Sequence, residues 1–241
     1  MDQFVEFKKA CEFGDIETVK RLIDSHLVNP VIYDNFAICM ASYSGHVELV
    51  RHLLADRRVN PVADNNYAIK YASEKGHVEV VKLLLADPRV NPAADNNYAI
   101  RYACQDGHVE IVKLLLADKR VEPSAIDNQS IRHAAENGHV EVVKLLLADP
   151  RVNPAANNNY AIRWASFNGH VEVVKLLLAD KRVDPSSNDN FAIRSASEKC
   201  HVEVVKLLLE DPRVDASKVK STNPEIREML AQWKYHPRKF L

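Results

Sequence analysis

A glycine that returns every 31 residues constrains this chain more than any other feature of its sequence. The repeated positions are Gly14, Gly45, Gly76, Gly107, Gly138 and Gly169, with Cys200 in the next place. The residues around the glycine also return with few changes, as in GHVEVVKLLL over 76–85. A fixed period of this length is typical of an array of small supersecondary units. The sequence therefore predicts stacked repeats in which neighbours bury each other's apolar faces.

One repeat, residues 65–95, shows the expected secondary structure. Two asparagines open it, and asparagine is a favoured N-cap for the helix predicted over 67–75. Gly76 is expected to end this helix in the left-handed conformation. A second, apolar-striped helix is predicted over 77–86 and ends before Pro88, because proline disfavours a helical residue in front of it. The connection that follows is short and lacks glycine, which predicts a loop in place of a β-hairpin.

These units predict an all-α solenoid of stacked helix-turn-helix repeats. No linker interrupts the period, so we expect a single domain over residues 1–241. Its expected parts are an N-terminal capping repeat at 1–33, six internal repeats at 34–64, 65–95, 96–126, 127–157, 158–188 and 189–219, and a C-terminal capping helix with a basic tail at 220–241. Asn223 and Pro224 should begin that last helix as N-cap and first residue.

The second half of each repeat, as in 76–85, resembles the ankyrin repeat. In the first half, Tyr67-Ala68-Ile69-Lys70 stands where that family usually has Thr-Pro-Leu-His, and the period is shorter than the usual 33 residues. The resemblance extends to the diverged arrays of large DNA viruses and protists. It implies a non-enzymatic scaffold for protein–protein interaction, which binds another protein on the concave face of an ankyrin-like solenoid.

Composition narrows the class of protein further. The net charge is −1, 46% of residues are hydrophobic, and no apolar run approaches the length of a membrane span. The four cysteines are far apart and lack the spacing of a zinc site, and no secretion signal opens the chain. We therefore expect a monomeric protein of the cytoplasm or nucleus that needs no metal or cofactor and has no small-molecule substrate.

The histidine after each glycine is the strongest catalytic candidate by residue type. Its repetition argues against an enzyme. It recurs at His46, His77, His108, His139, His170 and His201. Catalysis needs one constellation of a base and its orienting partner, whereas a residue copied in every repeat serves the architecture. The repeated Asn35, Asn66 and their equivalents are interpreted in the same way, as helix caps.

The informative positions are those that vary on the first helix of each repeat. At 3.6 residues per turn, positions 36, 40 and 43 share one face, with 39 at its border, opposite the core residues Ile38 and Ala41. Tyrosine, tryptophan and arginine dominate binding hot spots. The predicted partner-binding residues are therefore Tyr98, Arg101, Tyr102, His133, Tyr160, Arg163, Trp164 and Phe167.

Three alternatives remain open at this level. The aromatic rings could serve only to pack neighbouring repeats together. The arginine and aromatic rows could bind single-stranded nucleic acid, although the near-neutral net charge disfavours that interpretation. The C-terminal segment, with its stripe of Ile226, Met229 and Trp233 and its basic tail, could make the protein a regulatory adaptor, for example one that recruits a ubiquitin ligase.

Overall fold

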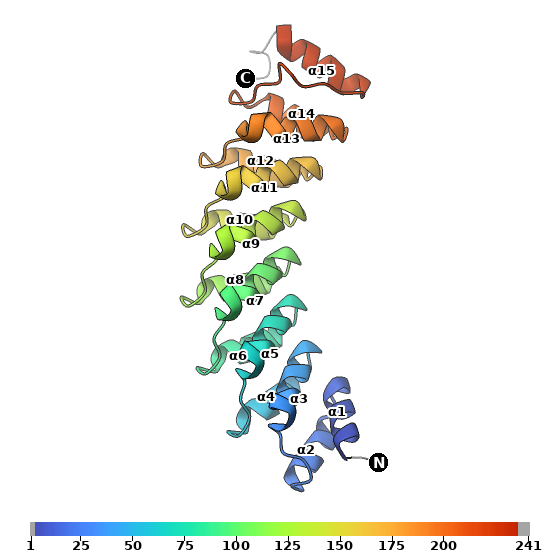
Figure 1. Ribbon diagram of the computed structural model, residues 1–241, viewed down its shortest axis with the longest axis vertical. Helices are drawn as coiled ribbons and strands as arrows, with labels where there is room; N and C mark the ends of the chain where they lie inside the picture. Colours follow the sequence, from blue (N-terminus) through green and yellow to red (C-terminus); the bar gives the residue numbers. More distant parts are fainter. Residues whose placement is uncertain (1–2, 236–241) are drawn as a thin grey trace. The chain divides into compact units, whose positions relative to one another are not determined.

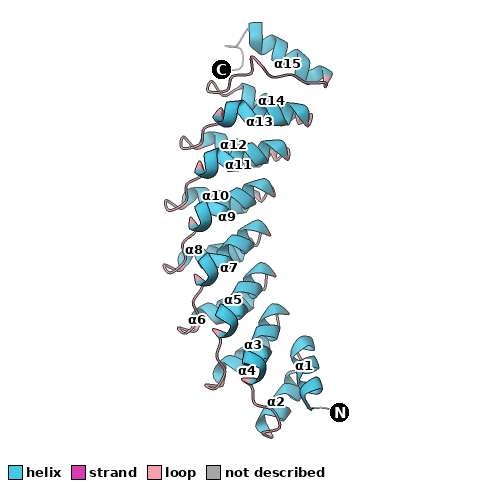
Figure 2. Ribbon diagram, in the orientation of Figure 1, coloured by secondary structure: helices cyan, strands magenta, loops and turns pink. Residues whose placement is uncertain are grey.

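The computed structural model describes residues 3–235, and within that range the chain consists of helices and loops with no β-strand (Figure 1, Figure 2). Its fifteen helices are α1 (Gln3–Phe13), α2 (Ile16–Asp24), α3 (Ile32–Tyr43), α4 (Val47–Ala55), α5 (Ala63–Glu74), α6 (Val78–Ala86), α7 (Ala94–Gln105), α8 (Val109–Ala117), α9 (Ala125–Glu136), α10 (Val140–Ala148), α11 (Ala156–Phe167), α12 (Val171–Ala179), α13 (Ser187–Glu198), α14 (Val202–Leu209) and α15 (Pro224–Tyr235). The predicted all-α fold of stacked helix-turn-helix repeats is confirmed.

The helices belong to two compact units. The first comprises residues 1–103 and 108–122, and the second comprises residues 104–107 and 123–241. In the first unit α3 packs against α1 and α5, while α4 packs against α6. In the second unit α11 packs between α9 and α13, and α12 packs against α10 and α14. Each unit is thus a stack of helix pairs, with first helices on first helices and second helices on second helices (Figure 1).

The core lies on the helix faces that the apolar spacing predicts. On α3 the side chains of Ala37, Ile38 and Ala41 are fully buried, and on α4 those of Val50 and Leu53 are fully buried. Burial of one such leucine or isoleucine side chain contributes about 1.5–3 kcal/mol. The small alanines of the first helices let neighbouring helices approach closely. No repeat has enough apolar surface to fold alone, so the stability is shared between neighbours.

Each first helix from α3 to α13 opens with a left-handed turn of three residues, which the sequence analysis did not predict. In α5 the turn consists of Asp64, Asn65 and Asn66, with φ of 47°, 52° and 61°. The same conformation occurs at 33–35, 95–97, 126–128, 157–159 and 188–190. An N-cap residue has extended backbone angles, so the prediction that these asparagines are N-caps is wrong. Asparagine and aspartate suit the turn because they tolerate the left-handed region better than other non-glycine residues.

The asparagine at the third position of each turn reaches the next repeat. Oδ1 of Asn66 accepts a hydrogen bond from the backbone N–H of Asn91 at 2.8 Å, and Oδ1 of Asn159 accepts one from Asp184 at 2.7 Å. The equivalent bonds of Asn35, Asn97, Asn128 and Asn190 are 2.7–2.8 Å long. Each carboxamide therefore accepts a hydrogen bond from a backbone N–H of the connecting loop 25 residues further along the chain, and it does not cap its own helix.

Ile126 is the residue least suited to its place in a left-handed turn. Its φ is 50°, and a left-handed β-branched residue is a genuine outlier. Asparagine occupies the equivalent place at Asn157 and Asn188 with φ of 52° and 55°. The isoleucine side chain is 48% exposed, so little burial is lost by replacing it.

We expect Ile126→Asn to raise the free energy of unfolding by about 1 kcal/mol, because asparagine relieves part of the left-handed strain. The measurement is urea unfolding followed by circular dichroism. Ile126→Val, which keeps the branched side chain, is the matched control and should change stability by less than about 0.5 kcal/mol. Equal stability of the asparagine and valine variants would mean that the turn holds no such strain.

The repeated glycine and histidine form a joint between neighbouring repeats. Gly138 has φ of 78°, which confirms the predicted left-handed helix end. His170 of the next repeat lies against it, and its Nε2 is 2.9 Å from the carbonyl oxygen of Glu136. The other five histidines make the same contact with a carbonyl one repeat earlier, at 2.7–3.0 Å. The histidines therefore have a structural role, as their repetition predicts.

The loops between repeats are short turns stabilised by an ion pair. Arg89 donates to Asp87 through its backbone N–H and its guanidinium, with the shortest contact at 2.6 Å. The hydrogen bonds from Arg89 hold the pKa of Asp87 below its usual value, although burial opposes the shift. The other Nη of Arg89 donates to the carbonyl of Val59 in the preceding repeat at 2.9 Å. The connection over 87–93 is therefore a short loop with turns and no β-hairpin, as predicted.

Helix α15 closes the described part of the second unit. Asn223 caps it by accepting the N–H of Ile226 at 3.1 Å, and Pro224 is its first residue, as predicted. Helix α15 packs on α14 and buries Ile226 completely. Met229 and Trp233 are partly buried on the same helix. Most of the predicted basic tail lies outside the described residues.

Candidate functional site

Aromatic side chains gather on the outer face of the first helices in both units. In the first unit Tyr98 and Tyr102 stack at 4.0 Å between ring centroids, and Tyr71 lies 5.5 Å from Tyr98. Tyr67 and Tyr71 pair at 4.2 Å. The pairs Tyr67–Tyr71 and Tyr98–Tyr102 are each four residues apart on one helix, the spacing at which side chains meet. None of the four rings is fully buried or fully exposed.

In the second unit the aromatic group is centred on Trp164 of α11. Its ring stacks on Tyr160 at 5.6 Å, tilts against Phe167 at 5.2 Å and lies 6.2 Å from Phe191 of α13. Lys199 places its ammonium 4.8 Å from the centre of the Phe167 ring. Tyr160, Trp164 and Phe167 are all partly exposed. We call these three residues the α11 cluster. Phe191 and Lys199, which complete its surroundings, were not among the predicted site residues.

Two tyrosines of the first helices donate hydrogen bonds to glutamates of the preceding repeat, at the places equivalent to residue 43. Tyr160 donates its hydroxyl to Glu136 at 2.9 Å, and Tyr98 donates to Glu74 in the same way. Burial and the bond to Glu136 raise the pKa of Tyr160 to about 12, and the same two causes raise the pKa of Tyr98. Both phenols therefore stay neutral and fixed at physiological pH.

Arg101 and Arg163 lack the glutamate that follows the equivalent cation by four residues in other repeats, so the sequence predicts that they are unpaired. The structure gives both arginines other partners. Arg163 donates from Nε to the carbonyl of Asn158 at 2.9 Å and from Nη2 to that of Asn157 at 3.2 Å. Arg101 makes the equivalent bonds and is only 7% exposed, so its prediction as an outward residue is wrong. These carbonyls belong to the left-handed turn, which leaves them without helical partners. The interpretation of Arg163 as unpaired is wrong for the same reason.

The guanidinium planes also lie against aromatic rings. Arg163 is 6.0 Å from the Tyr160 ring centre and 5.4 Å from that of Phe191, and Arg132 is 5.2 Å from the Tyr160 ring. Burial lowers the pKa of Arg163, although an arginine stays charged at any physiological pH. A cation near an aromatic face contributes about 0.5–2 kcal/mol. The arginines therefore brace the rings as well as the turns.

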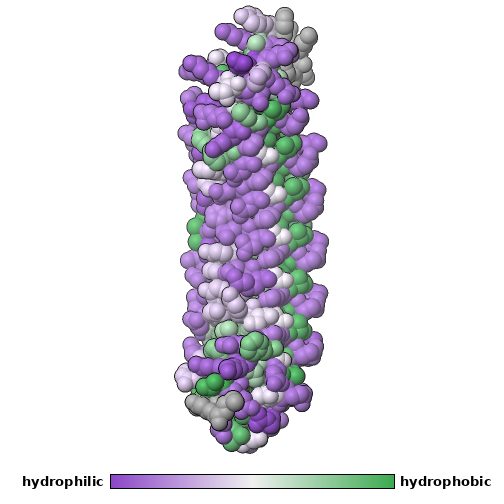
Figure 3. All heavy atoms as spheres, turned by 90° about the vertical axis from the view of Figure 1, so that its right-hand side faces the viewer, coloured by the Kyte–Doolittle hydropathy of each residue, from purple (hydrophilic) through white to green (hydrophobic). Residues whose placement is uncertain are grey.

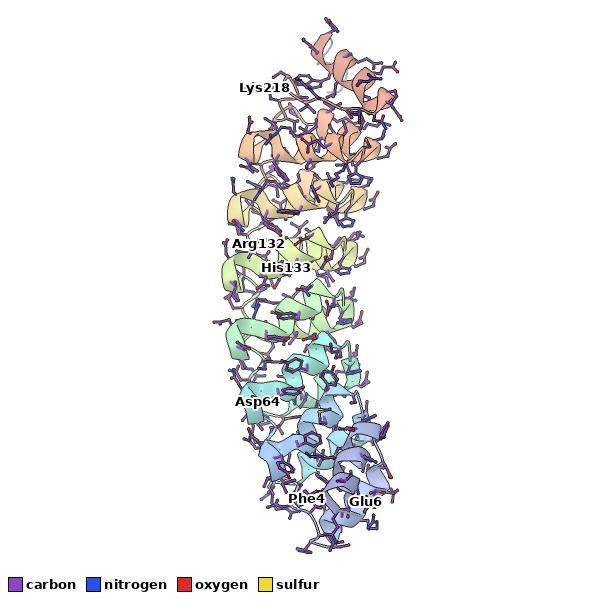
Figure 4. The ribbon with its side chains drawn as sticks, turned by 45° about the vertical axis from the view of Figure 1, so that its right-hand side comes forward. Phe4, Glu6, Asp64, Arg132, His133 and Lys218 are labelled. Carbon is purple, nitrogen blue, oxygen red and sulfur yellow. The ribbon has the colours of Figure 1, made fainter. Side chains whose placement is uncertain are left out.

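The eight predicted partner-binding residues are divided between the units. Tyr98, Arg101 and Tyr102 belong to the first unit. His133, Tyr160, Arg163, Trp164 and Phe167 belong to the second unit. His133 lies on α9 beside Arg132 (Figure 4), and its Nδ1 is 3.0 Å from Oε1 of Gln105. The α11 cluster brings together three of the predicted residues in direct contact.

The repeats of this chain match a known protein family. A model of the family described as ankyrin repeats (3 copies) matches residues 7–96, 38–127, 70–158 and 131–220. The chain belongs to the ankyrin-repeat family. No curated protein matches it. Ankyrin repeats generally mediate protein–protein interactions, and ankyrin-repeat proteins are generally non-enzymatic scaffolds.

Metal-ligand groupings and membrane-spanning helices are two further features that the described residues could contain. No three histidine, cysteine, aspartate or glutamate side chains among residues 3–235 are grouped so that they could hold a metal ion. None of the described helices is both long and apolar enough to cross a bilayer. The surface seen in Figure 3 is mainly hydrophilic, with hydrophobic side chains gathered in narrow bands.

Proposed function

We propose that this ankyrin-repeat protein binds another protein on the first helices of its second unit, with the α11 cluster as the centre of contact. The observation that carries the proposal is the mutual packing of Tyr160, Trp164 and Phe167, all partly exposed on one helix. Such rings are already ordered before a partner arrives. Pre-ordering reduces the entropy that binding would otherwise lose.

The composition of the α11 cluster suits the centre of an interface. Tryptophan and tyrosine are enriched where binding energy concentrates, and charged residues are depleted there. Phe167 stands where Glu74 and Glu136 stand in other repeats, so the cluster carries an apolar ring in place of a carboxylate. In the first unit Tyr98 and Tyr102 form a comparable but smaller pair, which we propose as an additional contact.

The nucleic-acid alternative loses its main support in this geometry. Arg101, Arg132, Arg163 and Arg194 direct N–H donors at carbonyls of their own turns. A phosphate would have to compete for these donors. The adaptor alternative depends on a second role for α15, whose buried Ile226 is accounted for by packing on α14.

The test is a quantitative comparison of partner capture by folded variants. We expect Trp164→Ala and Phe167→Ala each to weaken the binding of a captured protein by at least about tenfold, the effect of losing about 1.4 kcal/mol. Phe13→Ala is the matched control, because Phe13 is a 78% exposed ring in the first repeat. Equal binding by both α11 variants and the Phe13 control, measured by titration calorimetry, would place the contact elsewhere.

A further inference from the structure

The row of basic side chains on the first helices is interrupted once, at Cys39. The equivalent residues are Lys8, Lys70, Arg101, Arg132, Arg163 and Arg194. Several of these cations lie over the aromatic ring of the following repeat. In the first unit Lys8 is 5.5 Å from the centre of the Phe36 ring, and Lys70 is 5.7 Å from that of Tyr98. Cys39 cannot do the same for Tyr67, because a thiol carries no positive charge at any pH.

A cavity of about 210 Å³ lies where that cation is missing. It is lined by Tyr33, Phe36, Cys39, Met40 and Tyr67, together with the carboxylate residues Asp34 and Asp64. Within residues 3–235, no lysine or arginine is placed over the Tyr67 ring. The cavity therefore combines aromatic surface with negative charge between α3 and α5.

In the next repeat a lysine occupies the position that is equivalent to Cys39, and it pairs with a carboxylate. Nζ of Lys70 lies 3.5 Å from Oδ2 of Asp95, the residue 25 positions later. The residue 25 positions after Cys39 is Asp64, on α5 (Figure 4), and no ion pair among the described residues reaches it. The cavity thus keeps the carboxylate of Asp64 and the ring of Tyr67, but among the described residues no cation joins these two groups as Lys70 joins Asp95 and Tyr98.

We propose that this cavity receives a lysine or arginine side chain from a partner polypeptide. Its volume is below the roughly 300–1,000 Å³ of ordinary small-molecule sites, so it fits the end of a side chain better than a free ligand. Rings attract a cation at their faces, and a carboxylate adds a charge-assisted hydrogen bond. Lys8 holds its ammonium 4.5 Å from the Tyr33 ring and 5.5 Å from the Phe36 ring, so the place left for a partner's cation is against Tyr67 and Asp64.

This basic-residue site is independent of the proposed contact at the α11 cluster, and it can be tested without a natural partner. The probes are the lysine derivative N-acetyl-lysine-N-methylamide and its uncharged counterpart N-acetyl-norleucine-N-methylamide, titrated into the full chain. Binding is followed by the NMR shifts of the backbone amides of Cys39 and Tyr67. We expect saturable binding of the lysine derivative at least about tenfold tighter than that of the norleucine derivative.

Two substitutions decide whether binding occurs in the cavity. Cys39→Lys should fill it from within, as Lys70 does one repeat later, and abolish binding of the lysine derivative without lowering the melting temperature. Thr222→Lys adds the same charge at an exposed residue of the second unit, outside the cavity, and is the matched control that should bind as the unaltered chain does. Asp64→Asn changes an exposed residue and should weaken binding several-fold, so it tests the site even if Cys39→Lys does not fold.

The outcomes that would overturn the proposal are specific. Equal affinity for the lysine and norleucine derivatives would show that the cavity does not select a cation. Undiminished binding by both folded Cys39→Lys and Asp64→Asn would place the lysine derivative elsewhere. Binding of n-butylammonium as tight as that of the lysine derivative would contradict the assignment to a polypeptide, and absence of any binding would reject the site.

Discussion

Replacing Gly138 with valine should lower the free energy of unfolding by about 3 kcal/mol, measured by urea denaturation at neutral pH. Two independent effects add. The residue has φ of 78°, where an L-residue loses about 1–2 kcal/mol. A Cβ at this position would also lie 2.7 Å from Nδ1 of His170, and overpacking of this kind costs about 1–3 kcal/mol. The histidine must move, which also disturbs its contact with the Glu136 carbonyl.

Cys200 supplies the natural control for this prediction. It holds the same left-handed conformation, with φ of 60°, so this junction carries the backbone strain of a non-glycine residue while the turn keeps its shape. The chain places Gln232, not another histidine, 32 residues after Cys200, where the other joints have their histidine. Cys200→Gly should therefore gain only the backbone part, about 1 kcal/mol, and Cys200→Val should lose less than Gly138→Val. Equal losses for the two valine variants would remove His170 from the explanation.

Replacing Asn159 with alanine should lower the free energy of unfolding by about 3 kcal/mol. The buried Oδ1 of Asn159 accepts the N–H of Asp184 at 2.7 Å, and a buried donor left without its acceptor costs about 1–3 kcal/mol. Alanine also fits the left-handed conformation, φ of 57°, less well than asparagine. Both effects act in the same direction, and the loss should appear in urea unfolding as a lower midpoint.

Two substitutions separate the effects at Asn159. Asn159→Asp keeps an oxygen acceptor in the same place and should retain more stability than the alanine variant. Asn158→Ala changes the neighbouring exposed residue, φ of 55°, and should show only the backbone loss of about 1 kcal/mol. If Asn158→Ala and Asn159→Ala were equally destabilised, the bond to the next repeat would contribute nothing measurable.

Part of the candidate site could be predicted from local spacing. Tyr160 and Trp164 are four residues apart on one helix, so their stacking follows from helical geometry alone. The contact of Trp164 with Phe191 joins two repeats and depends on how closely α11 and α13 pack. The partners of Arg163 were missed because its acceptors are freed by the left-handed turn, a conformation that an Asn-Asn-Asn run permits but does not require.

The sequence by itself determined the period, the two helices of each repeat, their core faces and the left-handed glycine at each helix end. All of these depend on residues within one or two helical turns, where spacing and the steric limits of glycine and proline act directly. Only the tertiary structure decided that Asn159 serves the loop of the next repeat and that Cys39 leaves a cavity beside Asp64. Those outcomes pair groups 25 residues apart, and such pairs form only when neighbouring repeats have packed together.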